Sequence, residues 1–308
     1  MAMPLASPSD AVSEAVSGRR DAAHALAKAL PRLTLEARHV AMSVQTGLHG
    51  RRRAGAGETF WQFRPFTQGE AANRIDWRRS GRDDHLYVRE REWEAAHTVW
   101  LWIDQSPSMA FRSQWALDKK AHHAVILGLA LADLLVRGGE RVGHWQSGRT
   151  SQQRRIIDQL ALMLIEDAPH ATELPAARRL DRLHDMILIT DGLSPLEDWT
   201  NHIENLSQSG ARGHLVLIRD LAEVTLPYEG QYRLQATEGT QVLDIGDAAA
   251  FRSRYQQRMN THVAGLRTLC ARHHWHVHDH QTDKPLAPLL LALAGHLMQR
   301  PSLSVRQG

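Results

Sequence analysis

One segment, Val99-Trp-Leu-Trp-Ile-Asp-Gln-Ser-Pro-Ser-Met109, limits the possible folds of this chain more than any other. Five apolar residues lead into an abrupt turn that carries Asp104, Ser106 and Ser108. An unbroken apolar run of this length predicts a strand covered on both faces, as in the parallel sheet of an α/β protein. Because open α/β sheets bind ligands at the carboxyl ends of their strands, the turn is the first candidate for a functional site.

A second apolar run, Met186-Ile-Leu-Ile-Thr190, ends in Asp191 in the same way. One carboxylate and two hydroxyls on a loop, joined by a carboxylate from another strand, form an oxygen donor set suited to a hard cation such as Mg²⁺. We therefore expect Asp104, Ser106, Ser108 and Asp191 to bind a divalent cation, directly or through water. The alternative is that Asp104 and Ser106 only cap the turn, but the second strand that ends in an aspartate weakens this alternative.

The two strand ends together resemble the metal-ion-dependent adhesion site of von Willebrand factor A-like domains. The resemblance implies a binding module rather than a catalyst, in which an acidic side chain of a partner completes the shell of the cation. It also implies a threonine ligand from another loop. Thr172 is the first candidate and Thr150 the reserve, although Thr172 also suits the N-cap of a following helix.

From Thr98 onward, apolar strands and amphipathic helices alternate, which predicts a doubly wound, mostly parallel α/β sheet of the von Willebrand factor A-like (Rossmann-like) class. The expected strands are 98–104, 141–146, 186–190, 213–219 and 274–279, with a hairpin between Glu223 and Ile245. The expected helices are 114–137, 152–165, 173–183, 197–209, 248–272 and 285–299. We divide the chain into a disordered start and helical extension (1–54), a β-rich segment (55–95), the α/β domain (96–300) and a tail (301–308).

The β-rich segment indicates which family of proteins the chain resembles. It contains Gly55-x-Gly-Glu-Thr-Phe-Trp-Gln-Phe-Arg-Pro-Phe-x-x-Gly69, then Arg74-Ile-Asp-Trp-Arg-Arg-Ser-Gly-Arg82, then Val88-Arg-Glu. This signature resembles that of the bacterial "domain of unknown function fifty-eight" family, in which it precedes a von Willebrand factor A-like domain. Glu223-x-x-Leu-Pro227 and His280-x-Thr-Asp-Lys-Pro285 resemble later landmarks of the family. Relatives are commonly encoded beside MoxR-type AAA+ ATPases, which implies an adaptor for such an ATPase or its client.

Two roles are open for the signature residues, which are Arg64, Gly69, Arg74, Asp76, Trp77 and Arg82. In the favoured role, the charged members form a buried ion-pair network that fastens the segment to the domain, with Trp77 packed beneath it. In the alternative role, exposed arginines bind an acidic face of a partner.

The charge balance argues against a nucleic-acid-binding protein. The 37 Lys and Arg residues accompany 34 Asp and Glu residues, and the formal net charge is only +3. The start of the chain lacks the order of a signal peptide, and the longest apolar runs are too short to cross a bilayer. We expect a cytoplasmic protein without a membrane span.

The histidine-rich run His273-His-Trp-His-Val-His-Asp-His280 suggests a metal site at first sight. On a strand, His274, His276, His278 and His280 would share one face and could in principle bind zinc. The run occupies the position of the last strand, and no nearby cysteine or carboxylate pair completes a tetrahedral set. We predict an edge strand with a polar face here.

The favoured function is a non-enzymatic, Mg²⁺-dependent protein-binding adaptor. A metal-dependent hydrolase that uses the same strand-end pocket is the alternative. Ser106 stands where a phosphatase of the haloacid dehalogenase class has its second acid, and neither ligand loop carries an adjacent general base. The sequence also lacks a Gly-x-x-x-x-Gly-Lys nucleotide loop.

Overall fold

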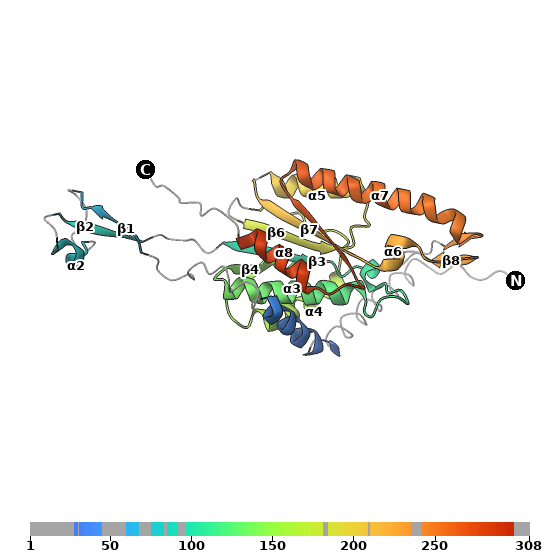
Figure 1. Ribbon diagram of the computed structural model, residues 1–308, viewed down its shortest axis with the longest axis horizontal. Helices are drawn as coiled ribbons and strands as arrows, with labels where there is room; N and C mark the ends of the chain where they lie inside the picture. The colour runs from blue at the N-terminus through green and yellow to red at the C-terminus, as the bar shows by residue number, and fades with distance from the viewer. Residues whose placement is uncertain are drawn as a thin grey trace.

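The computed structural model describes residues 28–29, 31–44, 60–67, 75–82, 85–91, 97–180, 184–208, 210–235 and 242–298 (Figure 1). The expected disordered start, the tail and the hairpin turn near residue 238 lie outside these residues. In the described part, none of the helices combines the length and the apolar character needed to cross a membrane.

A six-stranded sheet forms the centre of the fold, in the order β10-β7-β6-β3-β4-β5. Every neighbouring pair is parallel except β4 and β5, which are antiparallel. This confirms a mostly parallel α/β sheet of the Rossmann-like kind and all five predicted strands. The strands are β3 (Thr98–Ile103), β4 (Arg141–His144), β5 (Arg149–Ser151), β6 (His184–Thr190), β7 (Arg212–Arg219) and β10 (His276–Gln281).

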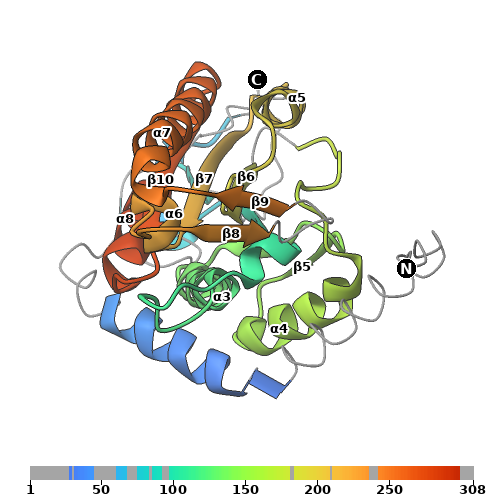
Figure 2. The ribbon, with the colours of Figure 1, turned by 90° about the vertical axis from the view of Figure 1, so that its right-hand side faces the viewer.

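Helices cover both faces of the sheet (Figures 1 and 2). One face packs against α3 (Lys120–Arg137), α4 (Ile156–Asp167), α8 (Ala287–Met298) and a helix over residues 31–44. The other face packs against α5 (Leu196–Ser207) and α7 (Ala248–Arg272).

The central strand β3 shows why its sequence is apolar throughout. Val99, Leu101 and Ile103 belong to the first core and Trp102 to the second, because successive side chains of a strand point to opposite faces. The unbroken apolar run is therefore the consequence of two buried faces.

The smaller elements lie outside the sheet. In the signature segment, β1 (Phe60–Pro65) pairs antiparallel with β2 (Tyr87–Arg91), and α2 (Trp77–Ser80) is a single turn. Near the carboxyl edge, α6 (Leu221–Thr225) precedes the hairpin of β8 (Tyr232–Gln235) and β9 (Val242–Ile245), which confirms the predicted hairpin. Two 3-10 turns, η3 (Pro107–Ala110) and η4 (Ala168–His170), complete the described elements.

One predicted helix is wrong. Residues 171–180 contain no helix, and this stretch runs as an irregular strap beside the end of β4. Trp145 Nε1 donates to the Ala176 carbonyl at 2.9 Å, and the Arg178 guanidinium donates to the carbonyls of Trp145 and Gln146. These tertiary hydrogen bonds, together with Pro175, replace the intrahelical ladder.

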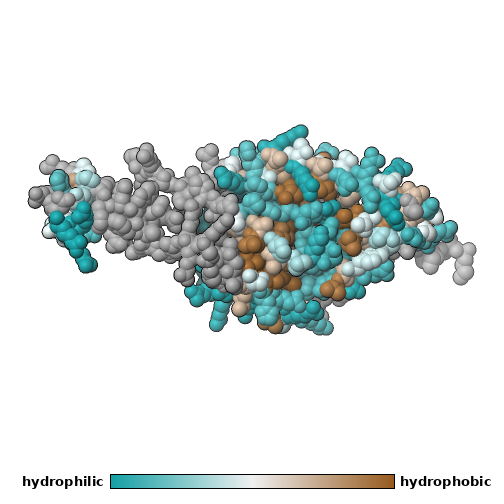
Figure 3. All heavy atoms as spheres, viewed as in Figure 1, coloured by the Kyte–Doolittle hydropathy of each residue, from teal (hydrophilic) through white to brown (hydrophobic). Residues whose placement is uncertain are grey.

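The surface of the molecule is largely polar on the face drawn in Figure 3, where apolar side chains form separate groups between hydrophilic ones. The large apolar side chains that are most exposed among the described residues include Leu117, at 87% exposure. Its position matters because Leu117 follows the candidate ligand loop.

Candidate functional site

The candidate site lies where the order of the strands reverses. The chain leaves β3 through α3 and enters β4 on one side, whereas β6 pairs with β3 on the other side. Asp104 follows β3 and Asp191 follows β6, so the two carboxylates flank this switch point at the carboxyl edge of the sheet. Open α/β sheets bind ligands at this point.

Asp104 is a buried carboxylate whose oxygens both accept hydrogen bonds. It is 1% exposed, Oδ1 accepts from the Ser106 backbone N–H at 2.8 Å, and Oδ2 accepts from the Thr190 hydroxyl at 2.7 Å. Burial, followed by the negative charge of Asp191, raises the pKa of Asp104 to about 7, although these hydrogen bonds act to lower it. Asp104 does cap the turn, as the alternative proposed, whereas the Ser106 side chain makes no capping hydrogen bond to η3.

Three oxygens gather beside Asp104. Ser106 Oγ lies 3.1 Å from Ser108 Oγ, and the Ser108 hydroxyl donates to Asp191 Oδ2 at 2.6 Å. Neighbouring ligands of an octahedral Mg²⁺ lie about 3.0 Å apart when each is at about 2.1 Å from the ion. The structure thus brings Ser106, Ser108 and Asp191 into contact beside buried Asp104. The Ser106–Ser108 distance is close to this spacing, whereas the hydrogen-bonded Ser108–Asp191 pair lies closer.

Gly192 makes the turn after Asp191 possible. Its φ is +71°, and a Cβ there would lie 2.6 Å from Leu217 Cδ2. The turn also directs the Leu193 N–H to Asp191 Oδ1 at 3.1 Å. A side chain at position 192 would therefore displace the carboxylate.

Lys120 is the functional residue that the sequence reasoning missed. It is fully buried at the start of α3, with Nζ 2.8 Å from Asp191 Oδ2 and 2.5 Å from Glu223 Oε1. Burial acts to lower its pKa, but Glu223 and Asp191 outweigh burial and leave the pKa raised. The signals in the sequence were a lysine heading an otherwise apolar helix, in a chain with lysine at four positions, and Glu223 within a family landmark.

Asp220 is a second missed residue. It is fully buried, its Oδ1 accepts from the Ala222 N–H to cap α6, and its Oδ2 accepts from the Ser113 N–H at 2.9 Å. Glu223 Oε2 in turn accepts from the Asp220 N–H at 2.9 Å. The end of β7 is thus connected both to Lys120 and to the loop between η3 and α3.

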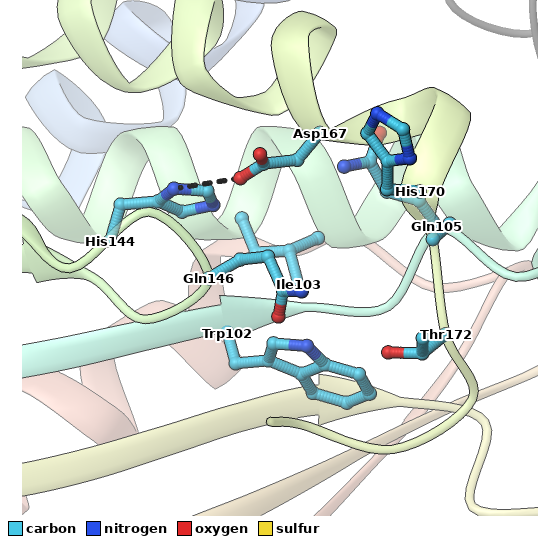
Figure 4. Close-up of a pocket in the computed structure, with 9 residues that line it drawn as sticks. Trp102, Ile103, Gln105, His144, Gln146, Asp167, His170 and Thr172 are labelled. Atoms are coloured by element: carbon cyan, nitrogen blue, oxygen red, sulfur yellow. Dashed lines mark ion pairs between the residues drawn. The ribbon is translucent and has the colours of Figure 1, made fainter. Parts of the chain in front are cut away.

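The two threonine candidates lie on two separate segments of the chain. The Thr172 hydroxyl donates to the Leu174 carbonyl at 2.6 Å, and Thr172 lines a pocket with Trp102 and Gln105 (Figure 4). No helix follows Thr172, so the N-cap alternative is wrong. Thr150 lies on β5 opposite Gly143, two strands from β3.

The pocket in Figure 4 is small and has both polar and apolar lining residues. His144 Nδ1 lies 3.3 Å from Asp167 Oδ2 and 3.0 Å from Ser147 Oγ, and burial, with Arg149 and Arg178 nearby, lowers the pKa of His144 to about 4. The pocket has a volume of about 20 Å³, which suits a single water molecule.

The signature residues that the structure describes do not all lie buried, as the favoured role requires. Trp77 is 65% exposed and Arg82 is exposed, so Trp77 does not pack beneath a network of charges. Asp76 instead caps α2 by accepting from the Arg79 N–H at 3.0 Å, and Val88 fills the interior of the segment. Arg64 lies in β1 opposite Val88, and Gly69 and Arg74 lie outside the described residues.

The histidine-rich run forms the edge strand β10, as predicted, but its face is packed rather than open. His276 and His278 lie against His214 of β7 and His296 of α8, with ring centroids 5.1 to 6.0 Å apart. His274 precedes the strand with φ +59°. Across the described residues, no group of three or more His, Cys, Asp or Glu side chains is arranged to hold a metal ion. The group of Asp104, Ser106, Ser108 and Asp191 includes two serine hydroxyls, so it is not a cluster of this type.

Comparison with known proteins places the chain among proteins without an assigned function. The family described as "Protein of unknown function DUF58" matches residues 62–265. The uncharacterized proteins Rv1480 of Mycobacterium tuberculosis and Mb1516 of Mycobacterium bovis are each 27% identical over 259 residues, which is 78% of this chain and 80% of each relative. No solved structure matches significantly.

Proposed function

Since this chain belongs to the DUF58 family, whose function is unknown, we propose one from its geometry: it is a non-enzymatic, von Willebrand factor A-like binding module. In this proposal a divalent cation, Mg²⁺, binds at the switch point and holds an acidic side chain of a protein partner. The observation that carries the proposal is the contact of the Ser108 hydroxyl with both Ser106 Oγ and Asp191 Oδ2, beside buried Asp104.

The donor set also fits a divalent cation in its charge. Asp104, Asp191 and Glu223 lie at one site with a single buried ammonium, that of Lys120. When all three carboxylates are ionised, the site has two negative charges in excess, which a divalent cation offsets. When bound, Mg²⁺ supplies a Lewis-acidic centre with coordination positions open to a carboxylate oxygen.

The residues of this chain then have distinct roles. Ser106, Ser108 and Asp191 supply ligand oxygens, and Asp104, held by Thr190 and the Ser106 N–H, keeps the loop in place. Because serine hydroxyls are neutral, they leave the cation with more of its positive charge, and hence with affinity for an incoming Asp or Glu.

Exposed apolar side chains lie on the segments that leave the site, which supports a protein partner. Leu117 is 87% exposed, Leu193 41%, and Trp115 and Leu196 37% each. Leu193 follows Asp191-Gly192, and Trp115 and Leu117 lie on the loop between Ser108 and Lys120. Apolar contacts beside one charged anchor are typical of protein interfaces. We propose a MoxR-type AAA+ ATPase or its client as the partner, on the family resemblance of the sequence.

The test is an affinity capture from native cell extract in Mg²⁺ and in EDTA, with the wild type, Ser108→Ala and Ser207→Ala. Ser108→Ala removes one proposed ligand without changing charge, whereas Ser207 lies at the end of α5 and serves as the matched control. We expect an AAA+ ATPase to be recovered in Mg²⁺ by the wild type and by Ser207→Ala, and to be lost in EDTA or with Ser108→Ala.

Equal recovery in all conditions would refute the cation-dependent contact. A metal-dependent turnover of phosphate or carboxylic esters that Ser108→Ala abolishes would instead support the hydrolase alternative.

A further inference from the structure

Lys120 connects carboxylates that follow two different strands. Its ammonium contacts Asp191 Oδ2 at 2.8 Å and Glu223 Oε1 at 2.5 Å, and Nζ also lies 5.8 Å from the centre of the Phe111 ring. The side chain has no exposure to solvent, so its charge is balanced by these two carboxylates.

One oxygen serves both Lys120 and the proposed cation site. Asp191 Oδ2 accepts from the Lys120 ammonium and from the Ser108 hydroxyl. A cation bound by Ser108 and Asp191 would therefore share this carboxylate with Lys120. Two positive charges on one buried carboxylate repel each other more strongly than in water, because the interior screens charge poorly.

Glu223 is the second carboxylate partner of the Lys120 ammonium. Its Oε2 is fixed by the Asp220 N–H, and the Tyr255 hydroxyl of α7 donates to the Glu223 carbonyl at 2.9 Å. Asp220 in turn holds the Ser113 N–H, in the loop that carries Leu117. A change at Lys120 is thus transmitted by direct contacts to α6, to α7 and to the exposed loop.

We propose that Lys120 is a regulatory positioning residue: the ammonium and a divalent cation compete for Asp191 Oδ2, and cation binding leaves the ammonium paired with Glu223 alone. Loss of the Asp191 contact changes the packing of α6 and of the loop over residues 111–119, so the affinity of a partner docked there depends on whether the cation is bound. This inference rests on the proposed cation site. It adds that the Lys120 ammonium competes with the cation, and that contacts through Glu223 and Asp220 connect the cation site to the exposed loop.

The first experiment measures Mn²⁺ affinity by electron paramagnetic resonance on the full chain, with Mn²⁺ as the probe. Lys120→Met removes the competing charge and is expected to bind Mn²⁺ at least about tenfold more tightly than the wild type. Lys119→Met, an exposed neighbour, is the matched control and is expected to leave the affinity unchanged. Glu223→Gln leaves Asp191 as the only carboxylate partner of Lys120 and is expected to weaken Mn²⁺ binding.

A double variant separates competition from simple loss of charge. If Glu223 acts through Lys120, Glu223→Gln weakens Mn²⁺ binding less in the Lys120→Met background than in the wild type. An equal effect in both backgrounds overturns the coupling. Hydrogen exchange of residues 221–225 gives a second readout: saturating Mg²⁺ is expected to change it in the wild type but not in Lys120→Met.

The outcomes distinguish this inference from the function on which it rests. Equal Mn²⁺ affinity of the wild type and Lys120→Met overturns the competition but leaves the cation site standing. Failure of every variant to bind Mn²⁺ overturns both. Binding by Lys120→Met alone supports the competition and shows that the lysine excludes the cation. If Lys120→Met does not fold, Glu223→Gln and the exchange measurement decide.

Discussion

The Thr190 hydroxyl donates to Asp104 Oδ2 across 2.7 Å, which joins the last residue of β6 to the first residue after β3. Both residues are 1% exposed, and the Asp104 N–H also donates to the Ile189 carbonyl at 2.9 Å. The two strand ends at the switch point are thus fixed by one backbone and one side-chain contact. This contact keeps a buried carboxylate beside Asp191 despite the repulsion that raises its pKa.

Thr190→Val tests this contact with little change in volume. We expect the free energy of unfolding to fall by about 1.5–3 kcal/mol, because a hydrogen bond to a buried carboxylate is lost. Urea unfolding at neutral pH measures the change. Thr268→Val on the exposed face of α7 is the control and is expected to stay within about 0.5 kcal/mol of the wild type.

Cation binding predicts a ligand-dependent gain in stability. If Mg²⁺ is present at about a hundredfold excess over its dissociation constant, unfolding should require about 2.7 kcal/mol more free energy. Thermal unfolding of the wild type with and without Mg²⁺ measures the gain, and Ser108→Ala should lose most of it. Ser207→Ala should keep it, and an equal gain in Ser108→Ala would show that the ion binds elsewhere.

The sequence predicted the α/β sheet and the group of four ligand candidates because both depend on local patterns. An apolar run that ends in an aspartate is visible in the chain, and parallel strands bring such ends to one edge. The role of Lys120 was not predicted because its partners, Asp191 and Glu223, lie 71 and 103 residues further along the chain. A buried lysine at the head of an apolar helix cannot be told from a solvated one without the tertiary contacts.

The errors have the same origin. Residues 173–183 have the composition of a helix, but Trp145 and Arg178 hold the strap by hydrogen bonds from another part of the chain. Trp77 was expected to pack beneath an ion-pair network of the signature residues, whereas it is exposed and the buried apolar residues of the small segment include Val88 and Ile75. In both cases tertiary packing overrides a local preference.

Acid should destabilise the protein through its packed histidines. Burial, together with the neighbouring imidazoles of His276 and His296, lowers the pKa of His214 to about 3 and of His278 to about 4. Unfolded histidine titrates near pH 6.5, at about its model-peptide value, so between these values the unfolded chain binds more protons. These histidines therefore do not lower the free energy of unfolding above about pH 6.5. The free energy of unfolding falls as the pH drops from there toward about 4, where His278 protonates in the folded state.

His278→Gln should reduce this pH dependence. Each such histidine contributes a slope of up to about 1.4 kcal/mol per pH unit, so losing one lowers the slope by up to that amount. Urea unfolding at several pH values between about 4.5 and 7 measures the slope. His39→Gln, at an exposed position, is the control. An unchanged slope in His278→Gln would contradict the titration of this group.

The exposed loop beside the site should carry partner contacts without carrying the cation. Leu117→Asp places a charge at the most exposed of the apolar positions near the site, 87% exposed, and we expect it to abolish recovery of the partner in Mg²⁺. The Mg²⁺-dependent gain in thermal stability should remain, because Leu117 supplies no ligand oxygen. Leu162→Asp is the matched control, since Leu162 is a 58% exposed leucine on α4. If both leucine variants lose the partner equally, the docking surface is not at this edge of the sheet. If Leu117→Asp alone loses it while the stability gain persists, cation binding and docking are separate functions of one loop, since Ser108 would bind the ion and Leu117 the partner.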